Sequence, residues 1–236
     1  MEPASIGQNV IIGEDVSFGN NVTIGNNVII YEKTKIGDDV VIQDNVVVGK
    51  QPSRAKNSIL SESQKLPGAV IGSGCTIGTS SIIYANASLA DDVFVADLAT
   101  IRERVTIGEK TIVGRGVSVE NDCDVGQKCK LETNCYVTAY SELGNYVFMA
   151  PYVVTTNDNY MARSKERYNH FKGVTIRDGG RVGANSTILP GKVIQEDGAV
   201  GAGSLVTKDV NTGEMVIGSP AKFYQKVPED QLLKNQ

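Results

Sequence analysis

The sequence predicts an all-β protein folded as a parallel β-helix, because an aliphatic residue recurs at every sixth position through almost the whole chain. The spacing holds in three runs, residues 6–48, 71–155 and 176–206, in which only Thr155 replaces the apolar residue. An α-helix would need spacings of three and four, and an amphipathic strand a spacing of two. A period of six instead fits a solenoid whose unit is one short strand and one turn.

Each six-residue unit, or hexad, has an inner and an outer side. In Ile24-Gly25-Asn26-Asn27-Val28-Ile29, the first and fifth positions carry the residues that point inward. Gly, Asn and Asp lie between them and supply turn conformations that β-branched residues resist. Three hexads make one triangular coil, so residues eighteen apart stack on neighbouring coils about 4.8 Å apart. We expect one solenoid over residues 1–211 and a C-terminal tail over residues 212–236.

Two insertions interrupt the repeat, near residues 50–70 and 157–175, and both are rich in polar and basic residues. Long loops on a regular scaffold are usually functional. Five whole coils separate the two insertions, so both should leave the same corner, roughly 24 Å apart. That separation suits a groove for an extended ligand such as a nucleotide sugar. Two unrelated surface loops are the alternative.

The composition excludes several classes of function. The net charge of −4 gives no general attraction to nucleic acid or to an anionic membrane. The apolar runs are far shorter than a membrane span. The first residues do not form a signal peptide, so a cytoplasmic protein is expected.

Four cysteines and one lysine occupy inward fifth positions of their hexads. The cysteines replace Ser, Ala or Val there and lack the spacing of metal ligands, so they should be structural thiols without disulfides; they are Cys75, Cys123, Cys129 and Cys135. Lys192 departs from the pattern, and a local shift at Pro190-Gly191 would turn it outward.

The only histidine, His170, lies in the second insertion. A zinc site made of three histidines, as in the γ-type carbonic anhydrases that share such a solenoid, is therefore excluded, and no metal site is expected. No histidine on a coil is available as a general base. His170 is most simply a solvated loop residue, although it would be able to reach back across the groove.

Carboxylates and amides on the coils are the remaining candidates for chemistry. Glu103 and Asn121 both take the third hexad position, eighteen residues apart, and stack on the face from which both insertions leave. We predict that these two residues are catalytic. A solvated Glu103 between Arg102 and Arg104 is the alternative. The predicted substrate-binding residues are Asp97, Glu120, Asn157, Asp158, Lys50, Arg54 and His170, of which Asp97 lies on another face of the Glu103 coil.

The end of the repeat is similar to the usual C-terminal signature of the hexapeptide-repeat acyltransferases. Val206-Thr207-Lys208-Asp209-Val210 and Ile217-Gly218-Ser219-Pro220-Ala221-Lys222 carry this resemblance, which extends over roughly residues 6–222. It implies a left-handed β-helix, an exception to the usual right-handed crossover. The period alone does not determine the hand.

Three further segments resemble nucleotide-sugar N-acyltransferases that act on dTDP-linked amino-dideoxyhexoses; they are residues 96–103, 130–134 and 156–159. The resemblance implies a homotrimer with active sites between subunits and acyl-CoA along the later coils. It implies transfer of an acyl group from coenzyme A to a 3- or 4-amino group of the sugar, in the biosynthesis of cell-surface or O-antigen glycans. The cofactor-binding residues would be Gly183, Ala184, Gly201 and Ala202 for pantetheine, and Lys208 and Lys222 for phosphate.

A mechanism follows from the chemistry of amide formation. Glu103 would accept the proton of the amine and Asn121 would orient the amine or the acyl carbonyl. A substrate that handles its own proton, with the departing thiolate as acceptor, is the alternative. Other acceptors, such as an amino acid or a lipid-A precursor sugar, and a non-catalytic trimeric scaffold also remain open.

Overall fold

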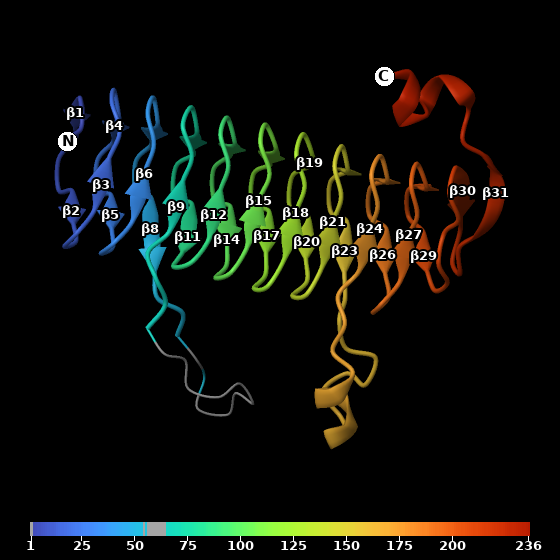
Figure 1. Cartoon of the computed structure of the whole chain (residues 1–236). Helices are drawn as coiled ribbons and strands as arrows, with labels where there is room; N and C mark the ends of the chain where they lie inside the picture. The colour runs from blue at the N-terminus through green and yellow to red at the C-terminus, as the bar shows by residue number, and fades with distance from the viewer. Residues whose placement is uncertain (1, 54, 56–64) are drawn as a thin grey trace.

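The computed structural model describes residues 2–53, 55 and 65–236 of the chain. These residues form a three-sided solenoid of short parallel strands (Figure 1). Sheet A contains β1 (Ser5–Ile6), β4 (Thr23–Ile24), β7 (Val41–Ile42), β10 (Thr76–Ile77), β13 (Phe94–Val95), β16 (Ile112–Val113), β19 (Lys130–Leu131), β22 (Phe148–Met149), β25 (Arg181–Val182), β28 (Ala199–Val200), β30 (Glu214–Ile217) and β31 (Lys222–Lys226).

The other two sides are also single sheets. Sheet B contains β2 (Ile11–Ile12), β5 (Ile29–Ile30), β8 (Val47–Lys50), β11 (Ile82–Tyr84), β14 (Thr100–Ile101), β17 (Ser118–Val119), β20 (Tyr136–Val137), β23 (Val154–Thr155), β26 (Thr187–Ile188) and β29 (Leu205–Val206). Sheet C contains β3 (Ser17–Phe18), β6 (Lys35–Ile36), β9 (Val70–Ile71), β12 (Ser88–Leu89), β15 (Thr106–Ile107), β18 (Asp124–Val125), β21 (Glu142–Leu143), β24 (Thr175–Ile176) and β27 (Val193–Ile194).

Strands eighteen residues apart pair in parallel, as Ile6 with Ile24 and Ile24 with Ile42. The fold is thus an all-β parallel solenoid, consistent with a left-handed β-helix, as the sequence predicted. The solenoid has three corners, each defined by the sheet whose strands it follows. The A–B edge follows the sheet A strands, the loop edge follows the sheet B strands, and the tail edge follows the sheet C strands.

The core consists of the first and fifth hexad positions, as predicted. Ile24 and Val28 are buried, and the same holds along the solenoid. The fourth position adopts positive φ, for example 55° at Asn27, which explains the frequent Asn and Asp there. A Cβ at Gly7, in the second position, would lie 2.5 Å from the backbone of the next coil, so the close stacking at this site requires glycine.

Three residues differ from the simple inward pattern. Ile6 is 50% exposed and Ile12 is 39% exposed, because no earlier coil in the described chain covers them. Lys192 is partly exposed, whereas most fifth positions are fully buried.

All four cysteines are buried free thiols, as the sequence predicted. Burial raises the pKa of Cys75 and Cys135 to about 11 and the pKa of Cys123 to about 12. Burial also raises the pKa of the Cys129 thiol. These groups therefore stay protonated near neutral pH and pack as small apolar side chains.

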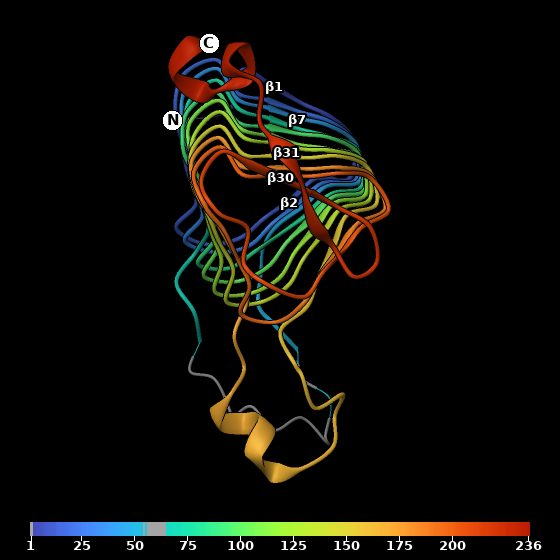
Figure 2. The same cartoon turned by 90° about the vertical axis from the view of Figure 1, so that its right-hand side faces the viewer.

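Both insertions leave the same edge, which confirms the prediction from their spacing. The first follows β8 and the second follows β23, and both strands belong to sheet B, five coils apart. Viewed along the axis, the described ends of the first insertion and the whole second insertion leave this loop edge on the same side (Figure 2). The second insertion contains the 3-10 helix η1 (Lys165–Asn169).

The C-terminal segment closes one end of the solenoid. β30, inside the expected tail, pairs in parallel with β28, and β31 returns antiparallel to β30. The 3-10 helices η2 (Glu229–Gln231) and η3 (Leu233–Asn235) lie across the molecule from the loops (Figure 2).

Candidate functional site

Polar and aromatic side chains stack along the loop edge between β8 and β23. The turns at the ends of β11, β14 and β17 hold the second, third and fourth hexad positions of their coils. This arrangement brings the predicted pair Glu103 and Asn121 into one column. Both side chains are largely buried. Glu103 is therefore not the solvated residue of the alternative interpretation.

Arg102 connects two carboxylates in this column. Its Nε and Nη2 atoms donate to Oε2 and Oε1 of Glu103 at 2.9 and 3.2 Å, a bidentate ion pair. Its Nη1 atom donates to Oε2 of Glu120 at 3.3 Å. Only 4% of the Glu103 side chain is exposed, against 25% of the Glu120 side chain. Glu120 is thus the carboxylate of this pair that solvent and ligands reach.

The pKa of Glu120 depends on its burial and on the charges of Arg102 and Glu103. Burial raises the pKa of Glu120, the Arg102 charge opposes that rise, and the Glu103 charge adds to it. A carboxylate with a raised pKa is a stronger base than a free one. Tyr136, on the next coil, also has a raised pKa, caused first by its burial and then by the charge of Glu120.

Basic and aromatic groups extend the cluster toward the first insertion. The Arg102 guanidinium lies 4.8 Å from the centre of the Tyr84 ring, and Lys50 Nζ lies 5.5 Å from the same centre. The predicted Lys50 is therefore close to the Glu103 cluster. Arg54 lies outside the described residues.

Asn121 is held by its own neighbours. Its Nδ2 atom donates to Oδ2 of Asp122 at 2.6 Å, and Arg104 Nη2 donates to the same oxygen at 2.8 Å. This network fixes the amide beside Glu120. Tyr84 and the linking role of Arg102 were not predicted, although residues 84, 102 and 120 are spaced by eighteen and hence stack.

The second insertion is organised around Asp158. The Asp158 carboxylate accepts hydrogen bonds from the backbone N–H groups of Tyr160 (2.8 Å) and Ala162 (3.0 Å) and pairs with Arg167 at 2.9 Å. The hydrogen bond from Ala162 is the main cause of its lowered pKa. Asp158 therefore shapes the loop from inside.

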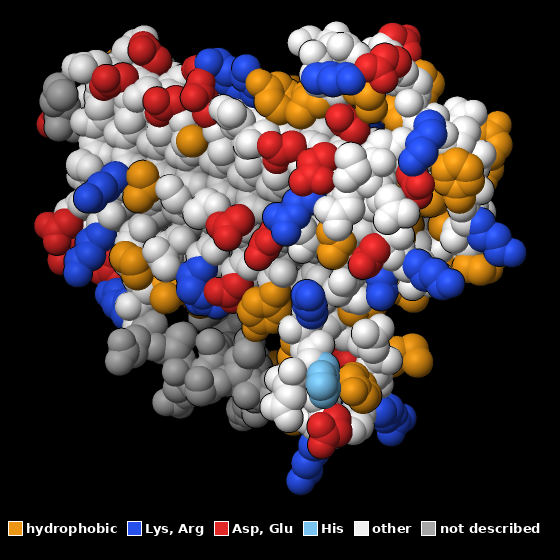
Figure 3. Space-filling model, turned by 45° about the vertical axis from the view of Figure 1, so that its right-hand side comes forward, with side chains coloured by type: hydrophobic (Ala, Val, Ile, Leu, Met, Phe, Trp, Pro, Cys, Tyr) orange, Lys and Arg blue, Asp and Glu red, His pale blue; other side chains and the backbone are white. Residues whose placement is uncertain are grey.

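The other two predicted residues of the second insertion lie at its base and on its surface. The Asn157 carbonyl accepts from Lys172 N at 3.2 Å, which closes the base of the insertion. His170 stacks on Tyr160 with 5.8 Å between ring centres, and its side chain is 56% exposed. In Figure 3 the histidine lies on the surface of the projecting loop.

Lys208 and Lys222 line one hollow of about 320 Å³, together with Pro220 and Phe223. Lys208 follows β29, so the hollow lies at the loop edge, on the C-terminal side of the second insertion. The two predicted phosphate-binding lysines are thus brought together.

The remaining predicted residues lie on a different edge. Asp97 follows β13, Gly183 and Ala184 follow β25, and Gly201 and Ala202 follow β28, all of sheet A, so all lie on the A–B edge. Asp97 Oδ1 accepts Thr79 N at 2.9 Å from the preceding coil. A Cβ at Gly183 would lie 2.5 Å from Ala202 N, so stacking of the coils already explains this glycine. A single chain therefore does not gather all the predicted residues in one place.

A metal centre or a membrane span would leave a recognisable pattern in the described part of the chain. Within it, no group of three His, Cys, Asp or Glu side chains is placed to hold a metal ion. Among the same residues, no helix has the length and apolar character of a membrane span.

Known proteins share the repeat. The family described as bacterial transferase hexapeptide (six repeats) matches residues 3–34 and 15–50, and the hexapeptide repeat of succinyl-transferase matches residues 99–139. A Schizosaccharomyces pombe protein named as an acetyltransferase is 31% identical over 91 residues, covering 37% of this chain and 44% of that protein. A Staphylococcus aureus protein named in the same way is 32% identical over 104 residues, covering 42% of this chain and 52% of that protein. The chain spans about half the length of the curated relatives it matches.

Similarity to solved structures is weak. Arabidopsis UDP-N-acetylglucosamine acyltransferase matches over 93% of this chain and 73% of that chain, with 15% identity and a TM-score of 0.49. Similarity at this level carries no information about the acceptor. The repeat matches and the curated relatives support a class, the hexapeptide-repeat acetyltransferases.

Proposed function

We propose that the protein is an acyltransferase that moves an acyl group from acyl-CoA to the amino group of a dTDP-linked amino-dideoxy sugar, for cell-surface or O-antigen glycans. The observation that carries this proposal is the arrangement of the loop edge. The Glu103, Glu120 and Asn121 cluster lies between the two insertions, and the hollow of Lys208 and Lys222 lies beyond the second. In this proposal the acceptor and the donor bind at separate places along one edge. The protein would act in the cytoplasm, where both substrates are available.

The chemistry needs a positioned amine and a place for its proton. The amine nitrogen attacks the thioester carbon, the C–N bond forms, the C–S bond breaks, and the proton ends on the coenzyme A thiolate. Proximity supplies much of the rate. Glu120 is the accessible carboxylate with a raised pKa, so it takes the proton from the amine. Glu103 holds Arg102 beside Glu120, and Asn121 orients the amine.

The proposal includes a homotrimer, because one chain leaves the predicted residues on two edges. The outer side of sheet B is apolar at Ile82, Tyr136 and Val154, and the A–B edge exposes Leu98 and Tyr152. The outer side of sheet C is mostly polar, with exposed Ser88, Thr106, Asp124 and Glu142 and one exposed valine, Val70. This asymmetry supports a cyclic assembly in which the A–B edge of one copy packs near sheet B and the loop edge of the next.

A thiol-release assay tests the proposal. The donors are acetyl-CoA and a longer acyl-CoA, and the acceptors are dTDP-3-amino and dTDP-4-amino dideoxy sugars, an amino acid and a UDP-linked amino sugar. Thiol release that depends on a dTDP-amino sugar is the expected result. Release with another acceptor alone would assign a different substrate. An absence of coenzyme A binding by calorimetry would favour a scaffold.

A further inference from the structure

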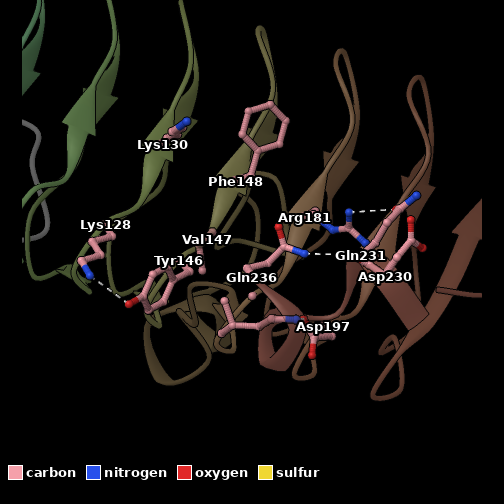
Figure 4. A pocket seen from close by; sticks show the side chains of 12 residues that line it. Lys128, Lys130, Tyr146, Val147, Phe148, Arg181, Asp197, Asp230, Gln231 and Gln236 are labelled. Atoms are coloured by element: carbon pink, nitrogen blue, oxygen red, sulfur yellow. Dashed lines mark hydrogen bonds between the residues drawn. The ribbon is translucent and has the colours of Figure 1, made fainter. Parts of the chain in front are cut away.

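A second pocket lies on the tail edge, across the molecule from the loops. It is a cavity of about 400 Å³ between η2, η3 and the solenoid, and we call it the tail pocket. Its walls carry Lys128, Lys130, Tyr146, Phe148, Arg181 and Gln231 (Figure 4). Figure 4 shows the Lys128–Tyr146 pair on one side and the Arg181–Gln231 pair on the other. None of the residues assigned above to acceptor or donor lines this pocket.

Arg181 is the unusual group in the tail pocket. Its Nη1 atom donates to Oε1 of the neutral Gln231 at 3.1 Å. Its Nε and Nη2 atoms are buried and find no hydrogen-bond partner among the described residues. Within the same residues, no carboxylate pairs with it at 4.0 Å or less. Two buried guanidinium nitrogens without an acceptor are costly, because their desolvation is not compensated.

Among the described residues, the other charged side chains of the pocket do not compensate the desolvation of Arg181. Lys128 Nζ lies 3.1 Å from the Tyr146 hydroxyl and 5.2 Å from the centre of the same ring. Asp197 Oδ1 already accepts Leu233 N at 2.8 Å. Lys128, Lys130 and Arg181 thus outnumber the two acidic residues of the lining, Asp197 and Asp230. The side chains of the pocket thus carry an excess of positive charge around guanidinium donors that have no partner among the described residues.

We propose that the tail pocket binds a phosphorylated small molecule that carries a flat ring, of the nucleoside monophosphate class. A guanidinium presents adjacent N–H donors that match two oxygens of a phosphate. Lys130 supplies a further charge, and the rings of Tyr146 and Phe148 offer flat apolar surface for a base. The volume lies in the range of small-molecule sites and exceeds what a bare inorganic anion fills.

Isothermal titration calorimetry with uridine 5′-monophosphate tests this proposal on the full chain. The wild-type protein should bind, and Arg181→Gln should weaken binding roughly 10- to 100-fold, because charge-assisted hydrogen bonds are lost. Lys110→Gln is the matched control, since Lys110 lies on the same edge but pairs with Glu109, outside the pocket. This control should bind like the wild type. Circular dichroism verifies that the Arg181 variant is folded, and Lys130→Gln provides a second variant with weaker binding.

Two further ligands test the parts of the proposal. Uridine without phosphate should bind much more weakly, and inorganic phosphate should bind more weakly than the nucleotide. Equal binding of phosphate and nucleotide would overturn the role of the rings. Equal nucleotide binding by wild type, Arg181→Gln and Lys130→Gln would overturn the site. The wild type and all the variants have the same loop edge, so any nucleotide binding there is equal in each of them. The difference in affinity between variants therefore reports on the tail pocket alone.

Discussion

The carboxylate pair beside Arg102 allows the catalytic base to be identified from the pH dependence of the rate. A base acts when it is deprotonated, so kcat/KM falls as the pH drops through its pKa. Since the pKa of Glu120 is raised, this acid limb should lie above the range of an ordinary glutamate. Glu120→Gln should remove the limb and slow turnover roughly 10²- to 10⁴-fold.

Glu103→Gln should leave the limb but move it to lower pH. Arg102 lies 3.3 Å from Glu120, an attraction of about 5 kcal/mol at an effective dielectric constant of 20 before solvent screening. Glu103 competes for that charge and repels Glu120. A change of about 1.4 kcal/mol in the electrostatic free energy of the Glu120 carboxylate lowers its pKa by about one unit. This change is less than a third of the attraction to Arg102. We therefore expect a shift of about one pH unit downward.

The assay is thiol release with acetyl-CoA and the preferred dTDP-amino sugar over a pH series. Glu142→Gln, which removes an exposed carboxylate on the outer side of sheet C, is the control and should change neither rate nor limb. Glu103→Ala, which also removes the support of Arg102, should slow turnover roughly 10²- to 10⁴-fold if the predicted catalytic role holds. Full rate in both Glu120→Gln and Glu103→Ala would refute the reasoning and leave the proton to the substrate itself.

Four further predictions concern the loop, the thiols, the core and the assembly. Shortening residues 157–173 to a plain turn should abolish nucleotide-sugar binding by calorimetry while circular dichroism stays native, because the hydrogen bonds of the solenoid run between coils; retained affinity would show that the shared edge is coincidence. The four cysteines should not react with a thiol reagent at neutral pH until denaturant is added, because burial raises the pKa of each thiol; rapid native labelling would contradict this. Leu131→Ala should lower the free energy of unfolding in urea by about 2–5 kcal/mol, since the side chain is fully buried. Sedimentation equilibrium at micromolar protein should give a trimer, and a monomer would refute the proposed assembly.

The sequence period predicted the architecture well because each hexad position meets the same physical demand on every coil. A residue such as Ile24 or Val28 is inward in any register that stacks coils, so burial followed from spacing alone. The shared edge of the two insertions followed from counting whole coils. The exposure of Ile6 and Ile12 did not follow from the period, because the period does not determine whether another coil lies before the first.

The interactions of the candidate site were less predictable. The third hexad position places Glu103 on the loop edge, but the period does not determine the direction of a side chain at a turn. Glu103 folds against Arg102 and is buried, whereas the expectation was either a reactive or a solvated carboxylate. Glu120, predicted only to bind substrate, is the exposed member of the pair. Spacing thus located the column, and side-chain pairing decided which carboxylate reaches a ligand.

The division of the predicted residues between two edges bears directly on assembly. Sheet B separates the A–B edge from the loop edge, so Asp97 and Gly183 of one chain cannot reach its own Glu120. If the residues of both edges serve one reaction, a second copy must bring its A–B edge to the first copy's loop edge. Such a contact is heterologous, and repetition of it closes into a ring. The apolar outer side of sheet B, beside the loop edge, is where that contact would bury surface, whereas the polar outer side of sheet C would remain in solvent.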